Sequence, residues 1–350
     1  MRPLRVLVAD DSAFNRRTIA DILSQLPGVE IVGKAVDGEQ ALSLAFLEKP
    51  DLVTLDLEMP RMDGFTFLKI LMAKQPTPVI VISSRSAKVD VFRALELGAL
   101  DFVIKPSGGS PQELATIREE LSAKVAMVRQ LRPLRAPERV VSSTFLRPVS
   151  DERTGPTESL PRKLVVIGAS TGGPPALVRM FARFTADLPA TFVIAQHMPE
   201  RFTKTFADRL ERLGGLHVSE IDDRATIRAG RAFVCPGGFC VEIHARPAGL
   251  FAQVVAPTSD DRYVPSVDRL FRTAAEVFGP RVVAVVLTGM GDDGTKGAQA
   301  VRDAGGLVLC ESEESAAIHG MPGSVVRAGL AHEILSLQAL SERVVKLVRE

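Results

Sequence analysis

The segment VVIGASTGGPP, residues 165–175, constrains the fold of this chain more than any other stretch. Its continuous apolar run is typical of a strand that is buried on both faces, as in a parallel sheet. A glycine-rich turn follows, and Pro174 and Pro175 then favour the first turn of a helix. The next apolar residues recur at helical spacing and define one face of that helix: Leu177, Met180, Phe181 and Phe184. The segment therefore predicts a strand–turn–helix unit of an α/β fold.

Ser170 occupies the turn of this unit. Its hydroxyl is expected near unpaired N–H groups and the positive end of the helix dipole. Both stabilise negative charge during acyl transfer, so the position favours a nucleophilic serine. The local sequence GASTG, residues 168–172, fits the G-x-S-x-G pattern, and Gly168, Gly172 and Gly173 would let the chain bend and a substrate come close. A glycine-rich turn with Ser170 as a helix cap is the alternative, and a dinucleotide-binding loop fits less well.

Composition and charge exclude several classes of protein. The chain has 350 residues, 46% hydrophobic and 24% charged, which suits two globular domains. A net charge of +1 argues against nucleic-acid binding. The apolar run Leu4–Ala9 is followed at once by acidic residues, so it predicts a strand and not a signal peptide, and no run is long enough to span a membrane. We expect a cytoplasmic protein whose three cysteines are small buried side chains.

The first part of the chain alternates strand-like and helical patterns, which predicts a flavodoxin-like (βα)5 domain with a parallel sheet. One common strand order for this fold is 2-1-3-4-5, with function at the carboxyl ends of the strands. The expected strands are Arg5–Ala9, Glu30–Ala35, Leu52–Asp56, Val79–Ile82 and Asp101–Ile104.

Polar residues follow these strands. Asp10 and Asp11 end the first strand, Asp56 the third, Ser83 the fourth and Lys105 the fifth. Any one aspartate could be an ordinary helix cap, but three carboxylates at one sheet edge would repel each other unless a hard cation such as Mg²⁺ lay between them. A carboxylate beside Mg²⁺ can attack phosphorus, and a lysine can hold the phosphoryl oxygens.

Residues 1–125 resemble the response-regulator receiver domain. The resemblance rests on VADDS (8–12), LDLEMPRMDG (55–64), ISS (82–84) and IKPS (104–107). It implies that Asp56 is phosphorylated and that Asp10, Asp11, Asp56 and the backbone carbonyl of Glu58 surround Mg²⁺. Ser83 would be the hydroxyl that moves on phosphorylation, and Lys105 would contact the phosphoryl group.

Residues 126–162 are expected to form a linker between the receiver and a second domain at 163–350. The stretch 132–163 is rich in Pro, Ser, Thr and Arg and shows no periodicity. Its few apolar residues could still contact a domain surface: Val140, Val141, Phe145 and Leu146.

The sequence of the second domain predicts a doubly wound, mostly parallel α/β fold. The strand Thr191–Gln196 ends at His197, and the strand Val282–Leu287 runs into TGMGDDG, residues 288–294. Ser170, His197 and the Asp292/Asp293 pair should therefore lie at one sheet edge, where a Ser–His–Asp arrangement can form. Backbone N–H groups in the turns at Thr171 and Met290 are candidate oxyanion donors.

His319 competes with His197 as the general base. The order Ser170, Asp293, His319 is that of α/β-hydrolases, whereas Ser170, His197, Asp293 matches no familiar order. Geometry and not chain order defines such a triad, so the residues alone leave both histidines open.

Residues 163–348 resemble the chemotaxis protein-glutamate methylesterases, the CheB family. The motifs are VIGASTGGP (166–174), AQHMPERFTKTFADRL (195–210), CPGG (235–238), VPSVDRLF (264–271), LTGMGDDGTKGA (287–298) and HGMPGSV (319–325). The resemblance implies a triad of Ser170, His197 and Asp293, with Met290 as a backbone oxyanion donor and the Thr171 hydroxyl beside the nucleophile. Phe239 and Cys240 depart from the family pattern, which puts selectivity in question.

The implied function is a phosphorylation-activated methylesterase for adaptation in chemotaxis-type signalling. It would hydrolyse glutamyl methyl esters on methyl-accepting chemoreceptors, release methanol and also deamidate receptor glutamines. A cognate histidine kinase would supply phosphate, Mg²⁺ would serve the receiver, and ester hydrolysis would need no cofactor. In the unphosphorylated state the receiver would cover the catalytic cleft. Two alternatives stay open: a response regulator whose second domain only binds a partner, and a metabolic esterase that uses His319.

Overall fold

A computed structural model describes residues 2–84, 88–105, 110–129, 159–213 and 215–350. The chain divides into two compact units, Met1–Val140 and Val141–Glu350. Most of the expected linker, with its four apolar residues, lies outside the described residues. Residues 126–128, which were expected in the linker, belong to the last helix of the first unit.

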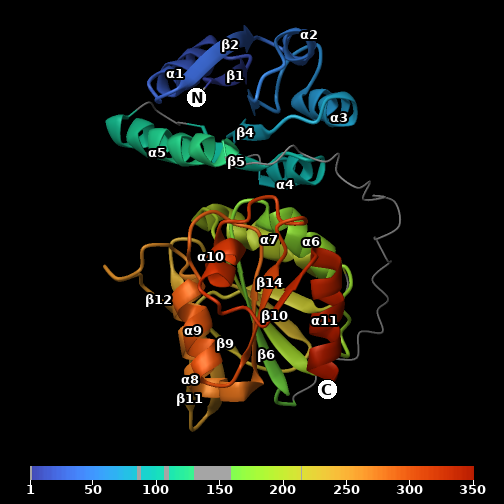
Figure 1. The fold of residues 1–350 in the computed structure, drawn as a ribbon, viewed down its shortest axis with the longest axis vertical. Helices are drawn as coiled ribbons and strands as arrows, with labels where there is room; N and C mark the ends of the chain where they lie inside the picture. Colours follow the sequence, from blue (N-terminus) through green and yellow to red (C-terminus); the bar gives the residue numbers. More distant parts are fainter. Residues whose placement is uncertain (1, 85–87, 106–109, 130–158, 214) are drawn as a thin grey trace. The chain divides into compact units, whose positions relative to one another are not determined.

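The first unit is a five-stranded parallel sheet in the order β2-β1-β3-β4-β5, which confirms the predicted flavodoxin-like topology (Figure 1). The helices begin at acceptor side chains: Ser12, Asp37 and Asp63 each accept a hydrogen bond from the first turn of the helix that follows. The elements are β1 (Leu4–Ala9), α1 (Ala13–Ser24), β2 (Val29–Ala35), α2 (Gly38–Glu48), β3 (Leu52–Leu55), α3 (Gly64–Lys74), β4 (Val79–Ser83), α4 (Lys88–Glu96), β5 (Asp101–Ile104) and α5 (Pro111–Val128).

The second unit contains a seven-stranded parallel sheet in the order β15-β14-β13-β6-β7-β10-β8. Its elements are β6 (Lys163–Ala169), α6 (Gly173–Phe181), β7 (Ala190–Gln196), α7 (Glu200–Glu211), β8 (His217–Glu220), β9 (Arg224–Thr226), β10 (Arg231–Val234), β11 (Cys240–Arg246), β12 (Gly249–Val255), α8 (Val267–Phe278), the 3₁₀ turn η1 (Gly279–Arg281), β13 (Val282–Val286), α9 (Thr295–Asp303), β14 (Leu307–Glu311), α10 (Met321–Arg327), β15 (Glu333–Leu335) and α11 (Leu337–Arg349).

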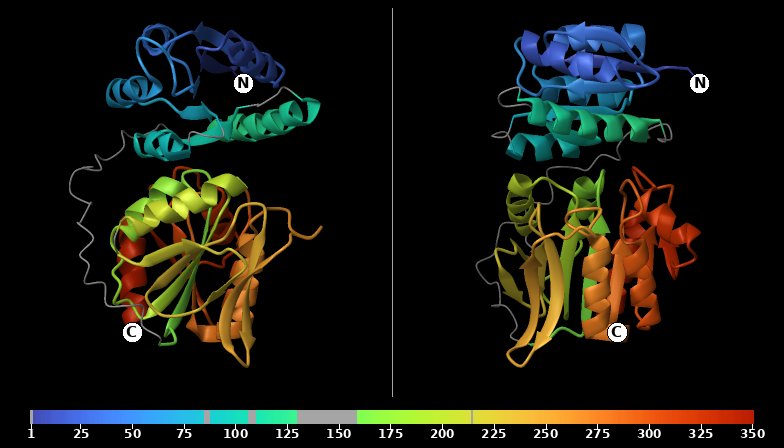
Figure 2. Two further views of the ribbon diagram at one scale, coloured as in Figure 1. Left: turned by 180° about the vertical axis from the view of Figure 1, so that it is seen from behind. Right: turned by 90° about the vertical axis from the view of Figure 1, so that its left-hand side faces the viewer.

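Helices cover both faces of this sheet, as a doubly wound fold requires (Figure 2). Helices α8, α9 and α10 lie on one face, and α6, α7 and α11 lie on the other. A separate antiparallel sheet, β11-β12-β9, packs beside α8. This small sheet was not predicted, because its strands mix apolar and charged residues without strict alternation.

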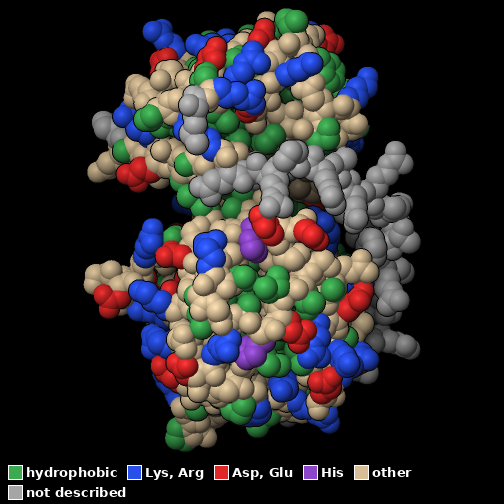
Figure 3. Space-filling view, viewed as in Figure 1, with side chains coloured by type: hydrophobic (Ala, Val, Ile, Leu, Met, Phe, Trp, Pro, Cys, Tyr) green, Lys and Arg blue, Asp and Glu red, His purple; other side chains and the backbone are tan. Residues whose placement is uncertain are grey.

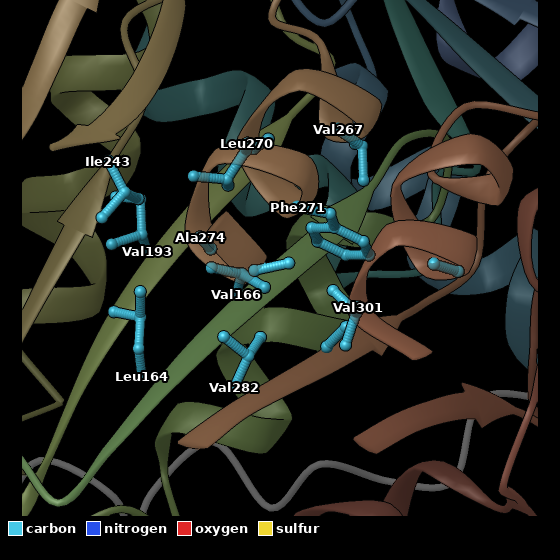
Figure 4. Close-up of a cluster of buried hydrophobic side chains, with 14 of the residues drawn as sticks. Leu164, Val166, Val193, Ile243, Val267, Leu270, Phe271, Ala274, Val282 and Val301 are labelled. Carbon is cyan, nitrogen blue, oxygen red and sulfur yellow. The ribbon is translucent and has the colours of Figure 1, made fainter. Parts of the chain in front are cut away.

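A hydrophobic core joins helix α8 to the middle of the sheet. Figure 4 shows Phe271 and Ala274 of α8 over Val166 of β6, and all three side chains are fully buried. Burying a large apolar side chain contributes about 1.5–3 kcal/mol, so this contact holds the N-terminus of α8 against the strand that leads to Ser170. The three cysteines are buried here and elsewhere in this unit, as expected.

The surface carries charges of both signs on the visible face of each unit, with apolar side chains only in small groups (Figure 3). None of the helices among the described residues has the length and hydropathy that a membrane crossing needs.

Candidate active site

The serine turn lies at the carboxyl end of β6, between that strand and α6. The N–H of Ser170 donates to the carbonyl of Thr288 at 3.0 Å, and the carbonyl of Ser170 accepts from the N–H of Gly173 at 2.8 Å. Gly172 has a φ of 77°, which an ordinary L-residue adopts only with strain. The turn is thus held by backbone bonds on both sides, and the Ser170 residue stays partly accessible.

His197 follows the neighbouring strand β7. Its N–H donates to the carbonyl of Ala169 at 2.9 Å, so the histidine is tied to the residue just before Ser170. The side-chain amide of Gln196 donates to the carbonyls of both Ser170 and His197, each at 2.9 Å. These bonds fix the serine and histidine segments relative to each other.

Asp293 meets the imidazole of His197. Its Oδ2 lies 2.8 Å from Nε2 of His197, and the carboxylate is 1% exposed. Three backbone N–H groups also donate to this carboxylate, from Val267 at 2.9 Å, Asp268 at 2.9 Å and Gly294 at 3.0 Å. Two of them belong to the first turn of α8, whose dipole also favours a negative charge. The buried carboxylate is therefore fully supplied with donors.

His319 lies in the segment before α10, beside the loop that follows β13. It forms a parallel bridge with Gly289, and the hydrogen bonds to Asp293 come from His197 and the backbone. The contacts therefore favour His197 over His319. In the same loop, the backbone N–H of Met290 donates none of the hydrogen bonds found among the described residues. It is thus available to a ligand.

A hydrogen bond between Thr288 and Glu311 connects this site to β14. Neither residue was predicted from the sequence. The hydroxyl of Thr288 donates to the carbonyl of Thr171 at 2.9 Å and accepts from the N–H of Ile318 at 2.9 Å. Its own N–H donates to Glu311 at 2.8 Å. Burial raises the pKa of Glu311, although the Thr288 N–H and the Ser315 hydroxyl partly oppose that change. The only signal in the sequence is an acid at the end of an apolar strand.

Tyr263 was also missed, and it lies directly on the histidine. The two rings are nearly parallel, at 9°, with centroids 5.3 Å apart. The Tyr263 hydroxyl donates to Asp292 at 2.9 Å, and Arg262 pairs with the same carboxylate at 3.2 Å. Asp292 is therefore an exposed carboxylate at the rim of the site, whereas Asp293 is buried inside it.

Phe239 and Cys240 differ in their surroundings. Cys240 is buried at the start of β11, whereas Phe239 is 39% exposed. The preceding Gly237 lies against the backbone of Met198 and Glu200. The turn that precedes Phe239 thus lies against the segment that follows His197.

In the first unit the structure brings Asp10, Asp11 and Asp56 together at the carboxyl ends of β1 and β3. One carboxylate oxygen from each lies within 4.8 Å of the others. Lys105 follows β5, and its Nζ lies 2.5 Å from Asp56 and 3.1 Å from Asp10. A pocket at this edge is lined by Asp56, Leu57, Glu58, Phe65, Ser83, Ser84, Asp90 and Lys105.

The charges in this cluster are strongly coupled. Burial raises the pKa of Asp10, and the nearby charge of Asp56 adds to that effect while Lys105 opposes it. Burial would lower the pKa of Lys105, but its hydrogen bonds and ion pairs with Asp56 and Asp10 outweigh this and raise it. Ser83 is buried at the end of β4, within the same pocket.

The acidic cluster fits a divalent cation. Oδ2 of Asp10 is buried, and among the described residues its one close partner is the Lys105 ammonium at 3.1 Å. A second positive charge would compensate the buried carboxylates better than one ammonium can. Oxygen donors of this kind suit Mg²⁺.

A flavodoxin-like unit with an acidic pocket, joined to an α/β unit with a serine–histidine–aspartate cluster, defines a response regulator with an enzymatic output domain. Two family models match the chain accordingly: the response regulator receiver domain over residues 6–117, and CheB methylesterase over residues 165–344. The chain belongs to the CheB methylesterase family.

Relatives of known name agree over the full length. The chain is 47% identical to protein-glutamate methylesterase/protein-glutamine glutaminase 3 of Geobacter sulfurreducens, over 99% of this chain and 98% of that protein. It is 48% identical to protein-glutamate methylesterase/protein-glutamine glutaminase 6 of Anaeromyxobacter dehalogenans, over 100% and 97%. The crystal structure of the Thermotoga maritima CheB methylesterase catalytic domain covers 53% of this chain and 98% of its own, with 37% identity and a TM-score of 0.51.

Proposed function

We propose that this protein is a phosphorylation-activated protein-glutamate methylesterase that hydrolyses glutamyl methyl esters on chemoreceptors. One observation carries the proposal: the His197–Asp293 pair is tied by backbone bonds to the turn that presents Ser170. The names of the full-length relatives support the same reaction, and they also support deamidation of receptor glutamines as a second activity.

In the proposed reaction, Ser170 Oγ attacks the ester carbonyl carbon while its proton passes to His197. Asp293 occupies Nε2, so Nδ1 is the nitrogen that takes this proton. The imidazolium then protonates the departing methoxide, which leaves as methanol, and a glutamyl–Ser170 ester remains. Water attacks this ester with His197 again as base, which releases the glutamate carboxylate and restores Ser170. An amide substrate would follow the same steps and release ammonia.

The oxyanion of each tetrahedral intermediate needs donors near Ser170. We assign the backbone N–H of Met290 to this role, because it is available in the loop beside the serine turn. Thr171, whose hydroxyl we propose lies beside the nucleophile, follows Ser170 directly in the sequence. The backbone carbonyl of Thr171 accepts a hydrogen bond from the Thr288 hydroxyl. Removing one oxyanion donor costs on the order of 3 kcal/mol of transition-state stabilisation.

In the receiver, residues 1–125, we propose Asp56 as the phosphorylated residue. Asp10, Asp11, Asp56 and the Glu58 carbonyl would hold Mg²⁺, which when bound neutralises charge on the phosphoryl oxygens. Lys105 would contact the phosphoryl group, and Ser83 would move toward it. Phosphorylation adds charge and shifts the equilibrium toward a form with an open catalytic cleft. A linker that begins after α5 and ends at residue 162, followed by the catalytic domain at 163–350, completes this organisation.

The proposed partners are methyl-accepting chemoreceptors as substrates and a histidine kinase as phosphodonor. A cytoplasmic location stays a prediction that cell fractionation can check. The exposed ring of Phe239 is placed to influence which receptor segment is accepted.

The test is methanol release from a methylated receptor fragment, with and without a small-molecule phosphodonor and Mg²⁺. We expect release to rise with the phosphodonor, to vanish in Ser170→Ala and to lose its stimulation in Asp56→Asn. His197→Ala should be inactive, whereas His319→Ala should retain activity. No release under any condition, with Asp56 still phosphorylated, would support a binding output instead, and loss of activity only in His319→Ala would support a metabolic esterase.

A further inference from the structure

Tyr263 is the one aromatic side chain that the structure shows stacked on His197. The chain contains a single tyrosine and no tryptophan. The rings of Tyr263 and His197 lie at 9° with centroids 5.3 Å apart, which is a stacked arrangement. Asp293 contacts the edge of the same imidazole at Nε2. The histidine is therefore constrained on one face and on one edge by two different side chains.

The tyrosine is itself held in place by the loop that carries Asp292. Its hydroxyl donates to Asp292 Oδ1 at 2.9 Å, and the Arg262 guanidinium lies 5.1 Å from its ring centroid. Gly291, with a φ of 87°, leaves room for the hydroxyl, because a Cβ built there would be 2.4 Å from the Tyr263 oxygen. A loop glycine and a rim carboxylate thus set the position of the ring.

We propose that Tyr263 is a positioning residue for His197, with Asp292 holding the phenol and the ring holding the imidazole. This inference rests on the proposed function, in which His197 takes and returns the serine proton. The stacked ring prevents the imidazole from rotating away from Ser170. Its negative π face also stabilises the imidazolium that forms in the transition state.

The charged groups around the imidazole are compatible with this role. Asp293 faces the ring edge, while Asp292 and Arg262 form an ion pair beyond Tyr263 and largely offset each other. Burial, together with the hydrogen bond and the charge of Asp292, raises the pKa of Tyr263, so the phenol remains a donor. A neutral ring, and not a phenolate, is therefore what the histidine meets.

The kinetic test compares Tyr263→Leu with Tyr263→Phe in the full-length, phosphodonor-activated protein. Loss of the ring in Tyr263→Leu should lower kcat about tenfold, with KM changed by less than about twofold, because the ring acts on the imidazole and not on the substrate. Tyr263→Phe retains the ring and should recover most of that loss. Phe251→Leu, which removes a ring in the antiparallel sheet, is the matched control and should leave kcat unchanged.

A spectroscopic test does not depend on activity. Because Tyr263 is the sole tyrosine and tryptophan is absent, tyrosine fluorescence reports on this residue alone. Removal of the stacked imidazole in His197→Ala should change that fluorescence at fixed pH, whereas Phe251→Leu should leave it unchanged. Circular dichroism checks that each variant is folded.

Two results would overturn the inference. One is a kcat in Tyr263→Leu equal to that of the unmodified protein, and the other is tyrosine fluorescence that is unchanged in His197→Ala. A loss as large in Tyr263→Phe as in Tyr263→Leu would also contradict a role for the ring. If the unmodified protein releases no methanol, the proposed function fails, whereas the fluorescence test still decides whether the stack exists.

Discussion

Replacing Asp293 by asparagine tests how the buried carboxylate serves both the fold and the reaction. Four donors converge on its two oxygens. Oδ1 accepts from the N–H groups of Asp268 at 2.9 Å and Gly294 at 3.0 Å, and Oδ2 accepts from Val267 at 2.9 Å and from Nε2 of His197 at 2.8 Å. Asparagine offers one acceptor oxygen and one donor NH₂. In either orientation of the amide, its NH₂ group therefore faces two of the four hydrogen-bond donors.

The two orientations have different consequences. If the amide NH₂ faces Asp268 and Gly294, two buried N–H groups lose their acceptor, at about 1–3 kcal/mol each. If it faces Val267 and His197, one backbone N–H is left unpaired and Nε2 must become an acceptor. The ring proton then sits on Nδ1, which can no longer take the proton of Ser170. We therefore expect kcat to fall about 10³–10⁴-fold, which is about 4–5.5 kcal/mol of activation free energy.

The assay is methanol release from a methylated receptor fragment under phosphodonor, with KM and kcat measured separately. Urea unfolding followed by tyrosine fluorescence reports on the catalytic unit alone, since the single tyrosine lies there. Asp292→Asn is the matched control, because it makes the same chemical change at an exposed carboxylate one residue away and should lower kcat by no more than about tenfold.

Asp293→Asn with kcat within about tenfold of the unmodified protein, at unchanged unfolding free energy, would refute this reasoning. It would mean that the 2.8 Å contact does not set the tautomer of His197.

Three further changes probe other parts of the molecule. Burial raises the pKa of Glu311 in the folded state, so the contribution of Glu311 to the unfolding free energy should be largest below pH 4.5. That contribution should fall as the pH rises toward the folded pKa, by up to about 1.4 kcal/mol per pH unit. Glu311→Gln should remove this component of the pH dependence in urea titrations at several pH values. Thr288→Val leaves a buried carbonyl and a buried N–H without their hydroxyl partner, so it should destabilise the catalytic unit by about 2–4 kcal/mol. Thr288→Ser keeps the hydroxyl and should restore most of the lost stability. Equal unfolding free energies for the valine and serine variants would contradict this prediction. Asp10→Asn should weaken Mg²⁺ binding about tenfold or more in calorimetric titration. Asp51→Asn, at a half-buried aspartate just before β3 that pairs with Arg2, should not.

Much of the fold could be predicted from local patterns. The alternation of apolar runs and helical spacings predicted the five-stranded sheet, and each observed strand there differs from its prediction by at most one residue at either end. This works because burial on both faces of a parallel sheet demands continuous apolar runs. The antiparallel sheet at β9, β11 and β12 escaped prediction, since its strands are only half-buried and carry charged residues among the apolar ones.

Part of the candidate site was also predictable, because functional side chains in such folds follow the carboxyl ends of strands. Ser170, His197, the Asp292/Asp293 pair and the acidic residues of the first unit were all named on that basis. Three residues were not predicted, because each contacts a partner that is distant in the chain: Tyr263, Thr288 and Glu311. Tyr263 follows His197 by 66 residues (263 minus 197), and Thr288 follows Thr171 by 117.

By itself the sequence determined the two α/β units, the serine turn and the set of polar residues at the strand ends, since these follow from periodicity and turn chemistry within short segments. Only the tertiary structure shows that His197 contacts Asp293. Strand β6 is paired with β7 on one side and β13 on the other, and this order places the residues after those three strands side by side. Contact between His197 and Asp293, 96 residues apart, is a consequence of strand order, and strand order depends on packing across the whole sheet.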